Sequence, residues 1–136
     1  SRVLVLAAGV ADDGLAAEFA LEAGSTLYHS LIVHFENDVP IQFEDRWVNP
    51  ACAPAYLEQD FSSITPNEHL MVSAPLQGAT YTIEALPAVG DPATHLGIAP
   101  GAPCLVLHRR TTSAGRIASV VTMWHPGHLT RFTGSV

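Results

Sequence analysis

Three polar side chains with complementary chemistry alternate along one short stretch of this sequence. The segment IVHFENDVPIQFEDRWVNP, residues 32–50, alternates apolar and polar residues on both sides of a central Asn-Asp pair. His34, Glu44 and Arg46 all occupy even positions. On one face of a sheet, Arg46 or His34 could bind a small anion while Glu44 accepts a hydrogen bond from the same ligand. A solvated outer face with a weak ion pair is the alternative interpretation.

Three further residues could contribute to such a site. Arg109 and Ser119 fall among apolar residues of two later strands, where a buried arginine needs a carboxylate partner from the protein or from a ligand. Thr65 precedes a proline and stands three residues before Glu68, which predicts a capped helix start. Free N–H groups at a helix start also bind carboxylate and phosphate, so Thr65 either caps the helix alone or also faces a ligand.

The alternation predicts a β-hairpin, because strand side chains point to opposite faces in turn. We expect strands over Thr26–Glu36 and Ile41–Val48, joined by a loop of residues 37–39 whose Asn and Asp tolerate the left-handed conformation. The expected pairs across the loop are His34 with Gln42 and Glu36 with Pro40. The apolar odd positions form the expected core face: Leu31, Val33, Phe35, Ile41, Phe43 and Trp47.

The remaining elements predict an α+β domain, an antiparallel sheet with a few short helices on one side. Further strands are expected over Arg2–Ala8, Thr80–Leu86, Cys104–Thr112 and Arg116–Trp124, with a turn and a short edge strand in the tail. Helical segments are expected from Asp12 to about Glu22 with Gly24 ending it, over Ala55–Gln59, from Thr65 to before Ala74, and from Asp91. A faint repeat places Trp47 and Trp124 on equivalent strands.

Composition excludes several classes of protein. The chain has 136 residues, 48% of them hydrophobic and 14% charged, which fits one domain with a real core. A net charge of −7, with no lysine, disfavours nucleic-acid binding by this segment itself. No apolar run would span a membrane, and the start does not resemble a signal peptide. Two unpatterned thiols, Cys52 and Cys104, favour a reducing compartment, the cytoplasm.

Common catalytic and metal-binding motifs are absent. The sequence holds no HExxH, CxxC, GxGxxG or P-loop pattern, and no nucleophile–base pair is legible. His125 and His128 are the histidine pair whose spacing comes nearest to that of two metal ligands. They lie on an irregular segment with Pro and Gly, which is weak evidence for a metal site. We therefore expect no catalytic residues, no cofactor and no metal.

Several motifs resemble one family. HSLIVHFENDVPIQFEDRWVNP, APAYLEQDFSSITPNEHL, APLQGATYTIEA, LGIAPGAPCLVLHRRT and HPG follow one another in the order seen in GntR-superfamily repressors that carry a UTRA effector domain. The resemblance runs from about Gly24 to the end and favours the subgroup that controls histidine-utilisation genes. It implies a chorismate-lyase-like fold, a homodimer, and residues 1–136 as a single effector-binding domain. The family's winged-helix DNA-binding domain is missing from this chain.

The same resemblance implies a function and a site. The subgroup's effector is urocanate, a flat molecule with an imidazole and a carboxylate, and its binding releases DNA. By pattern, His34, Glu44 and Thr65 match family positions, while Ser119 and His125 fall near others; Arg46 and Arg109 are candidates from the residues themselves. Ile32 replaces a basic residue of the sugar-phosphate sensors, which favours a smaller anion. Two alternatives stay open: a lyase-like enzyme acting on a small aromatic or unsaturated carboxylic acid, and a pure dimerisation module.

Overall fold

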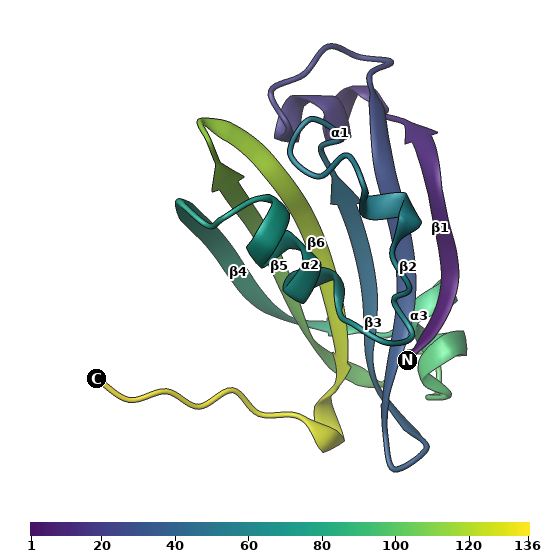
Figure 1. Cartoon of the computed structure of the whole chain (residues 1–136). Helices are drawn as coiled ribbons and strands as arrows, with labels where there is room; N and C mark the ends of the chain where they lie inside the picture. The colour runs from purple at the N-terminus through teal and green to yellow at the C-terminus, as the bar shows by residue number, and fades with distance from the viewer.

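A six-stranded antiparallel sheet forms the centre of the molecule (Figure 1). The computed structural model describes residues 1–136. The strand order is β1-β2-β3-β6-β5-β4, so the two long hairpins meet in the middle and β1 and β4 are the edges. The strands are β1 (Arg2–Val10), β2 (Thr26–Glu36), β3 (Val39–Val48), β4 (Gly78–Pro87), β5 (Pro103–Ser113) and β6 (Arg116–Pro126). The expected α+β class is confirmed.

Short helices cover both faces of the sheet rather than one, which corrects the prediction. They are α1 (Asp13–Glu18), η1 (Tyr56–Glu58), α2 (Pro66–Ser73), α3 (Gly90–Leu96) and η2 (Gly127–Leu129). The chain from residue 49 to residue 76, with η1 and α2, crosses one face, which we call the site face (Figure 1). Helices α1 and α3 pack on the other face, which we call the back face. None of these helices is long and apolar enough to cross a membrane.

The faint repeat has a structural counterpart. The chain runs strand, helix, hairpin twice, and the two units meet where β3 pairs with β6. Trp47 packs on the back face in the cluster that holds Phe19 of the α1 region. Trp124 packs on the same face against the cluster that holds Leu96 of α3. Each unit thus buries its tryptophan under its own helix.

Some of the even-numbered hairpin residues belong to the core. Ile32 and Val48 are fully buried with Tyr56 and Phe61 between the sheet and the covering segment. Ser30 is also fully buried, and its hydroxyl lies 2.8 Å from the Tyr56 hydroxyl, so each buried polar group has a partner. Burial raises the pKa of Tyr56 to about 12. The even face is therefore neither a solvated face nor a wholly polar one.

The turn of the first hairpin differs from the prediction by one residue. Asn37 and Asp38 form a two-residue turn with φ of 50° and 65°, and Glu36 pairs with Val39 rather than Pro40. The predicted pairing of His34 with Gln42 is confirmed, because a bulge beside Phe35 supplies the extra residue that the longer loop was expected to hold. The alternation therefore predicts the correct face for these side chains, although the predicted loop length is wrong.

Three other local predictions need correction. Helix α1 ends at Glu18, because Ala20 takes the left-handed conformation (φ 55°) and Leu21 N–H donates to Ala16 O in a Schellman-type ending, so Gly24 is not its terminator. Helix α3 begins at Gly90, with Asp91 in its first turn and not at its cap. The tail after η2 forms no strand, since it leaves the sheet and pairs with no neighbour (Figure 1).

Candidate functional site

The candidate site lies between α2 and the site face of the sheet. Gln42, Glu44 and Arg46 are successive residues of β3 on that face, because strand neighbours two apart share a side. Strand pairing adds residues from both sides: His34 of β2 lies opposite Gln42, and Met123 of β6 lies opposite Glu44. Arg109 of β5 joins the same face through β6. Three strands therefore supply polar side chains to the region under α2, and β6 adds Met123.

Glu44 is the centre of the charged group. Its Oε1 lies 2.9 Å from His34 Nε2 and its Oε2 accepts from Arg46 Nε at 2.9 Å. Burial alone would raise the pKa of Glu44, but the Arg46 guanidinium and the hydrogen bonds from His34 and Arg46 outweigh it and lower the pKa below its ordinary value. Glu44 is therefore ionised, and both of its oxygens are held within the protein.

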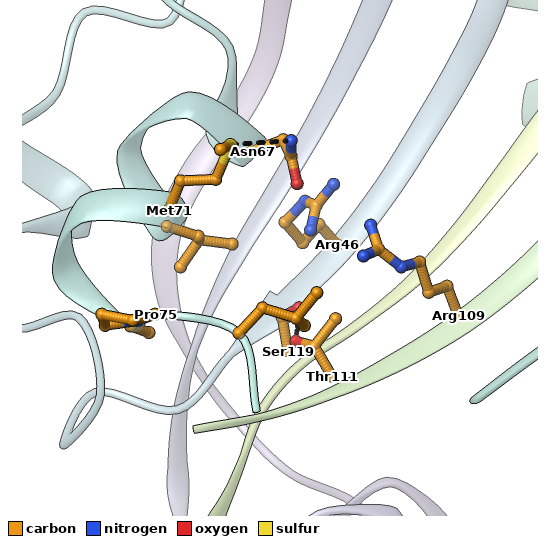
Figure 2. Close-up of a pocket in the computed structure, with 10 residues that line it drawn as sticks. Arg46, Asn67, Met71, Pro75, Arg109, Thr111 and Ser119 are labelled. Carbon is orange, nitrogen blue, oxygen red and sulfur yellow. Dashed lines mark hydrogen bonds between the residues drawn. The ribbon is translucent and has the colours of Figure 1, made fainter. Parts of the chain in front are cut away.

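Two arginines present amino groups to the cleft that no protein carboxylate engages. Arg46 is only 4% exposed and uses Nε alone on Glu44, which leaves its terminal amino groups for a ligand. Arg109 takes part in none of the four ion pairs of the structure. Figure 2 shows the two guanidinium ends directed toward each other, with Asn67 of α2 beside Arg46. Paired guanidinium groups of this kind suit a carboxylate, which accepts several N–H bonds.

The cavity beside these arginines is small and partly apolar. It measures about 220 Å³, below the roughly 300–1,000 Å³ of pockets for drug-sized ligands. Its polar lining comes from the sheet and from Asn67, and its apolar wall comes from α2 and the following turn: Leu70, Met71, Ala74, Pro75 and Leu76. A second hollow shares Arg46, Asn67 and Arg109 with it and continues toward His34 and Gln42. Together they form one cleft long enough for a small elongated ligand.

His125 of β6 lies next to Gln42, at the end of the series Gln42, Glu44 and Arg46. Its Nδ1 lies 3.0 Å from the Leu105 carbonyl oxygen and its Nε2 lies 2.9 Å from Gln42 Nε2. Burial lowers the pKa of His125 below its ordinary value, against a smaller opposing effect of the Leu105 carbonyl. Both ring nitrogens are engaged by the protein, so His125 supports Gln42.

The structure brings the predicted site residues together on one face. Six of the seven line the cleft: His34, Glu44, Arg46, Thr65, Arg109 and Ser119. His125 lines an adjoining hollow that also includes His34 and Gln42. Thr65 caps α2, with its Oγ1 accepting from Glu68 N–H at 3.1 Å, and Ser119 Oγ lies 2.8 Å from Thr111 Oγ1. The capping prediction for Thr65 is confirmed.

Other lining residues were missed. Gln42 shares the even alternation with Glu44 and Arg46, so the same pattern could have singled it out. Asn67, Leu70 and Met71 enter the cleft because α2 folds back over the sheet, and no local pattern predicts that docking. The structure contains no group of three potential metal ligands, counting histidine, cysteine, aspartate and glutamate.

Comparisons with known proteins agree with this architecture. The UTRA domain model matches residues 1–131. The C-terminal domain of histidine utilization repressor from Pseudomonas syringae pv. tomato superposes with a TM-score of 0.95 at 41% identity, covering 99% of this chain and 96% of that one. A GntR-family transcriptional regulator from Enterococcus faecalis has a TM-score of 0.87 at 17% identity, which shows the shared fold alone.

Curated relatives carry the same name as the first of these structures. The histidine utilization repressor of Pseudomonas putida is 41% identical over 133 residues, and that of Pseudomonas aeruginosa is 42% identical over 134 residues. Each match covers 98% of this chain but only 54% and 53% of the relative, so the chain spans about half the length of these proteins. These relatives are transcriptional regulators and not enzymes. The chain therefore belongs to the UTRA domain family and is similar along almost its whole length to the C-terminal domain of histidine utilization repressors.

Proposed function

We propose that this domain senses urocanate, or a closely related small carboxylate, for a repressor of histidine-utilisation genes. The observation that carries the proposal is the pair of arginines, Arg46 and Arg109, that converge on a small cavity with amino groups not engaged by any protein carboxylate. Occupancy of the cleft would release DNA from a DNA-binding domain outside residues 1–136. The names of the relatives support the regulatory context.

A flat ligand with one carboxylate suits the cleft. The carboxylate would lie between the two guanidinium groups, and the planar remainder would extend along the row formed by Glu44 and Gln42. A sugar phosphate is less suitable, since Ile32 is fully buried in the core and presents no charge to the site. The small cavity volume points the same way.

Glu44 has a supporting role in this proposal. Its two oxygens bond His34 and Arg46, so it fixes the Arg46 guanidinium in the orientation that binds the ligand. The enzyme alternative has less support, because a general base needs a free lone pair directed at the substrate. Glu44, the buried carboxylate of the cleft, already bonds His34 and Arg46, and its lowered pKa makes it a weak base.

We also propose that the domain forms a homodimer through the β4 side of the site face. Tyr81 and Ile83 of this edge strand are 68% and 44% exposed, and Leu76 just before it is 57% exposed. A contiguous apolar surface next to an unpaired strand edge is typical of a protein–protein interface. A second copy suits this surface, because a two-fold dimer buries the same apolar side chains on both copies. The cytoplasm remains the proposed location.

Calorimetric titration of the chain with urocanate tests the proposed effector. Arg109→Ala should weaken urocanate binding roughly 10- to 100-fold, because it removes charge-assisted hydrogen bonds to the carboxylate. The matched control is Arg110→Ala, which alters the exposed neighbouring arginine whose side chain points to the back face. Equal losses in the two variants, or no binding of urocanate to the unmodified chain at millimolar concentration, would contradict the proposal.

A further inference from the structure

We propose that Gln42 is the specificity residue for the end of the ligand opposite its carboxylate, and that it accepts a hydrogen bond from a ligand N–H through its Oε1. His125 is the positioning residue that fixes the direction of the Gln42 amide. This inference rests on the proposed function and names the ligand chemistry of the same cleft: a planar acid with an N–H donor at its far end. Gln42 was not among the residues predicted from the sequence.

The direction of the Gln42 amide follows from a chain of obligatory donors and acceptors. A backbone carbonyl can only accept, so His125 Nδ1, which lies 3.0 Å from Leu105 O, must carry a hydrogen. A neutral imidazole that is protonated on Nδ1 has a bare Nε2, which can only accept. The Gln42 group 2.9 Å from Nε2 is therefore the NH₂. Gln42 Oε1 is left to the cleft.

The neutral state of His125 has a physical cause. The side chain lies in the interior at the end of β6, with only 7% of its surface exposed, and the Phe132 ring packs edge-on at 5.3 Å between centroids. This burial disfavours the imidazolium form. Because neither ring nitrogen is free, His125 does not reach the ligand and acts only through Gln42.

Glu44, Ser119 and Thr111 each already have a hydrogen-bond partner within the protein. Both Glu44 oxygens are held by His34 and Arg46. The Ser119 and Thr111 hydroxyls bond each other at 2.8 Å. Asn67 Nδ2 donates to Met71 Sδ at 3.7 Å, and its amide lies beside Arg46 (Figure 2). Gln42 and Asn67 are thus the cleft amides whose oxygens have no hydrogen bond within the protein, and the Gln42 amide has its direction fixed by His125.

The spacing on β3 fits a ligand held at both ends. Gln42 and Arg46 are four residues apart, which places their Cα atoms roughly 13 Å apart in an extended strand. Their side chains stand on the same face with Glu44 between them, so a ligand that contacts both must be elongated and lie along this strand. A propenoic acid with a five-membered ring has such a shape, with its carboxylate and a ring N–H at opposite ends.

A matched pair of synthetic acids isolates the N–H contact. The probes are (E)-3-(1H-pyrrol-3-yl)propenoate and (E)-3-(furan-3-yl)propenoate, which have the same shape and carboxylate and differ in having N–H or oxygen at one ring position. The unmodified chain should bind the pyrrole acid at least tenfold more tightly in calorimetric titration, because the furan oxygen would face Gln42 Oε1 without a hydrogen. Gln42→Leu should bring the two affinities to within about twofold, because it weakens pyrrole binding and removes the unpaired oxygen that disfavours the furan acid.

Two further measurements complete the test. Ser119→Ala should keep the preference for the pyrrole acid, because its hydroxyl is engaged by Thr111. Nitrogen-15 spectra of the histidine rings should show His125 as the neutral tautomer with hydrogen on Nδ1, and His125→Phe should lower the pyrrole preference without loss of furan binding. A His125 ring with hydrogen on Nε2 would overturn the positioning role.

The outcomes separate this inference from the proposed function. Equal affinity of both probes for the unmodified chain would overturn the role of Gln42, while urocanate binding would still support the sensor. Loss of the preference in Ser119→Ala but not in Gln42→Leu would place the N–H at the other end of the cleft and overturn it as well. Failure of urocanate and both probes to bind would overturn the two proposals together.

Discussion

Arg46 and Arg109 face each other across one residue. Arg46 of β3 and Arg109 of β5 both pair with Val121 of β6, so the two arginines lie in the same row of the sheet on the same face. Two strand spacings separate their Cα atoms, roughly 10 Å. Val121 is 1% exposed and forms a short apolar floor between them. Sheet register, and not proximity in sequence, therefore creates the cationic pair.

Replacement of Arg46 by Met should destabilise the domain as well as weaken anion binding. The change leaves the Glu44 carboxylate, 3% exposed, with His34 as its remaining partner. Removing one member of a buried ion pair costs about 3–5 kcal/mol, so urea unfolding should show a loss of that order. The double variant with Glu44→Leu should recover part of it, because no buried charge is then stranded. A stability equal to that of the unmodified chain would contradict this account of the pair.

Folding stability should fall in acid, and part of the loss should come from protonation of Glu44. The folded-state pKa of Glu44 is lowered from 4.5, so its contribution is fully present above that value and is lost as the pH falls through the lowered pKa. Asp60, whose pKa the Ser62 and Ser63 hydroxyls lower, adds to the same acid window. Thermal unfolding between neutral pH and pH 3 should therefore show a shallower pH dependence in Glu44→Gln. An unchanged slope would show that Glu44 does not titrate in that window.

The alternation of apolar and polar residues predicted the correct face of the site even though the length of the hairpin loop was predicted wrongly. The pairing of His34 with Gln42 is correct although the expected three-residue loop is a two-residue turn with a bulge. A slip of one residue would have sent Glu44 and Arg46 to the back face, so the buried ion pair depends on that bulge. A bulge leaves no distinct mark in composition, which is why the turn was predicted wrongly.

Burial was the weaker part of the prediction. Alternation distinguishes two faces but does not reveal that a distant segment covers one of them. Ile32 and Ser30 are fully buried because Tyr56 and its neighbours fold over the sheet, and that docking depends on contacts between residues far apart in sequence. The same docking brings Asn67 and Met71 over the arginines. The polar residues of the hairpin form a cleft only together with the covering segment, and alternation along the hairpin does not predict that segment's position.

Thr65 can be tested for its two possible roles separately. Thr65→Ala should cost about 1 kcal/mol of stability, because the Glu68 N–H loses its cap. Thr65→Asp should keep the cap and the stability, since aspartate is a good N-cap residue. The new carboxylate would stand in the hollow that also contains Arg46 and Arg109 and should compete with an anionic ligand, lowering urocanate affinity. Full ligand affinity in Thr65→Asp would place the carboxylate of the ligand away from the start of α2.

The proposed dimer can be tested on the two sides of one strand. Tyr81 and Thr82 are neighbours on β4, and the strand geometry directs their side chains to opposite faces. Tyr81→Glu introduces a charge into the exposed apolar surface and should convert the dimer to a monomer in light scattering, because a desolvated, unpaired carboxylate is costly. Thr82→Glu adds the same charge on the back face and should remain dimeric. If both variants, or the unmodified chain itself, are monomeric at the highest concentration measured, the proposed dimer through the β4 surface is contradicted.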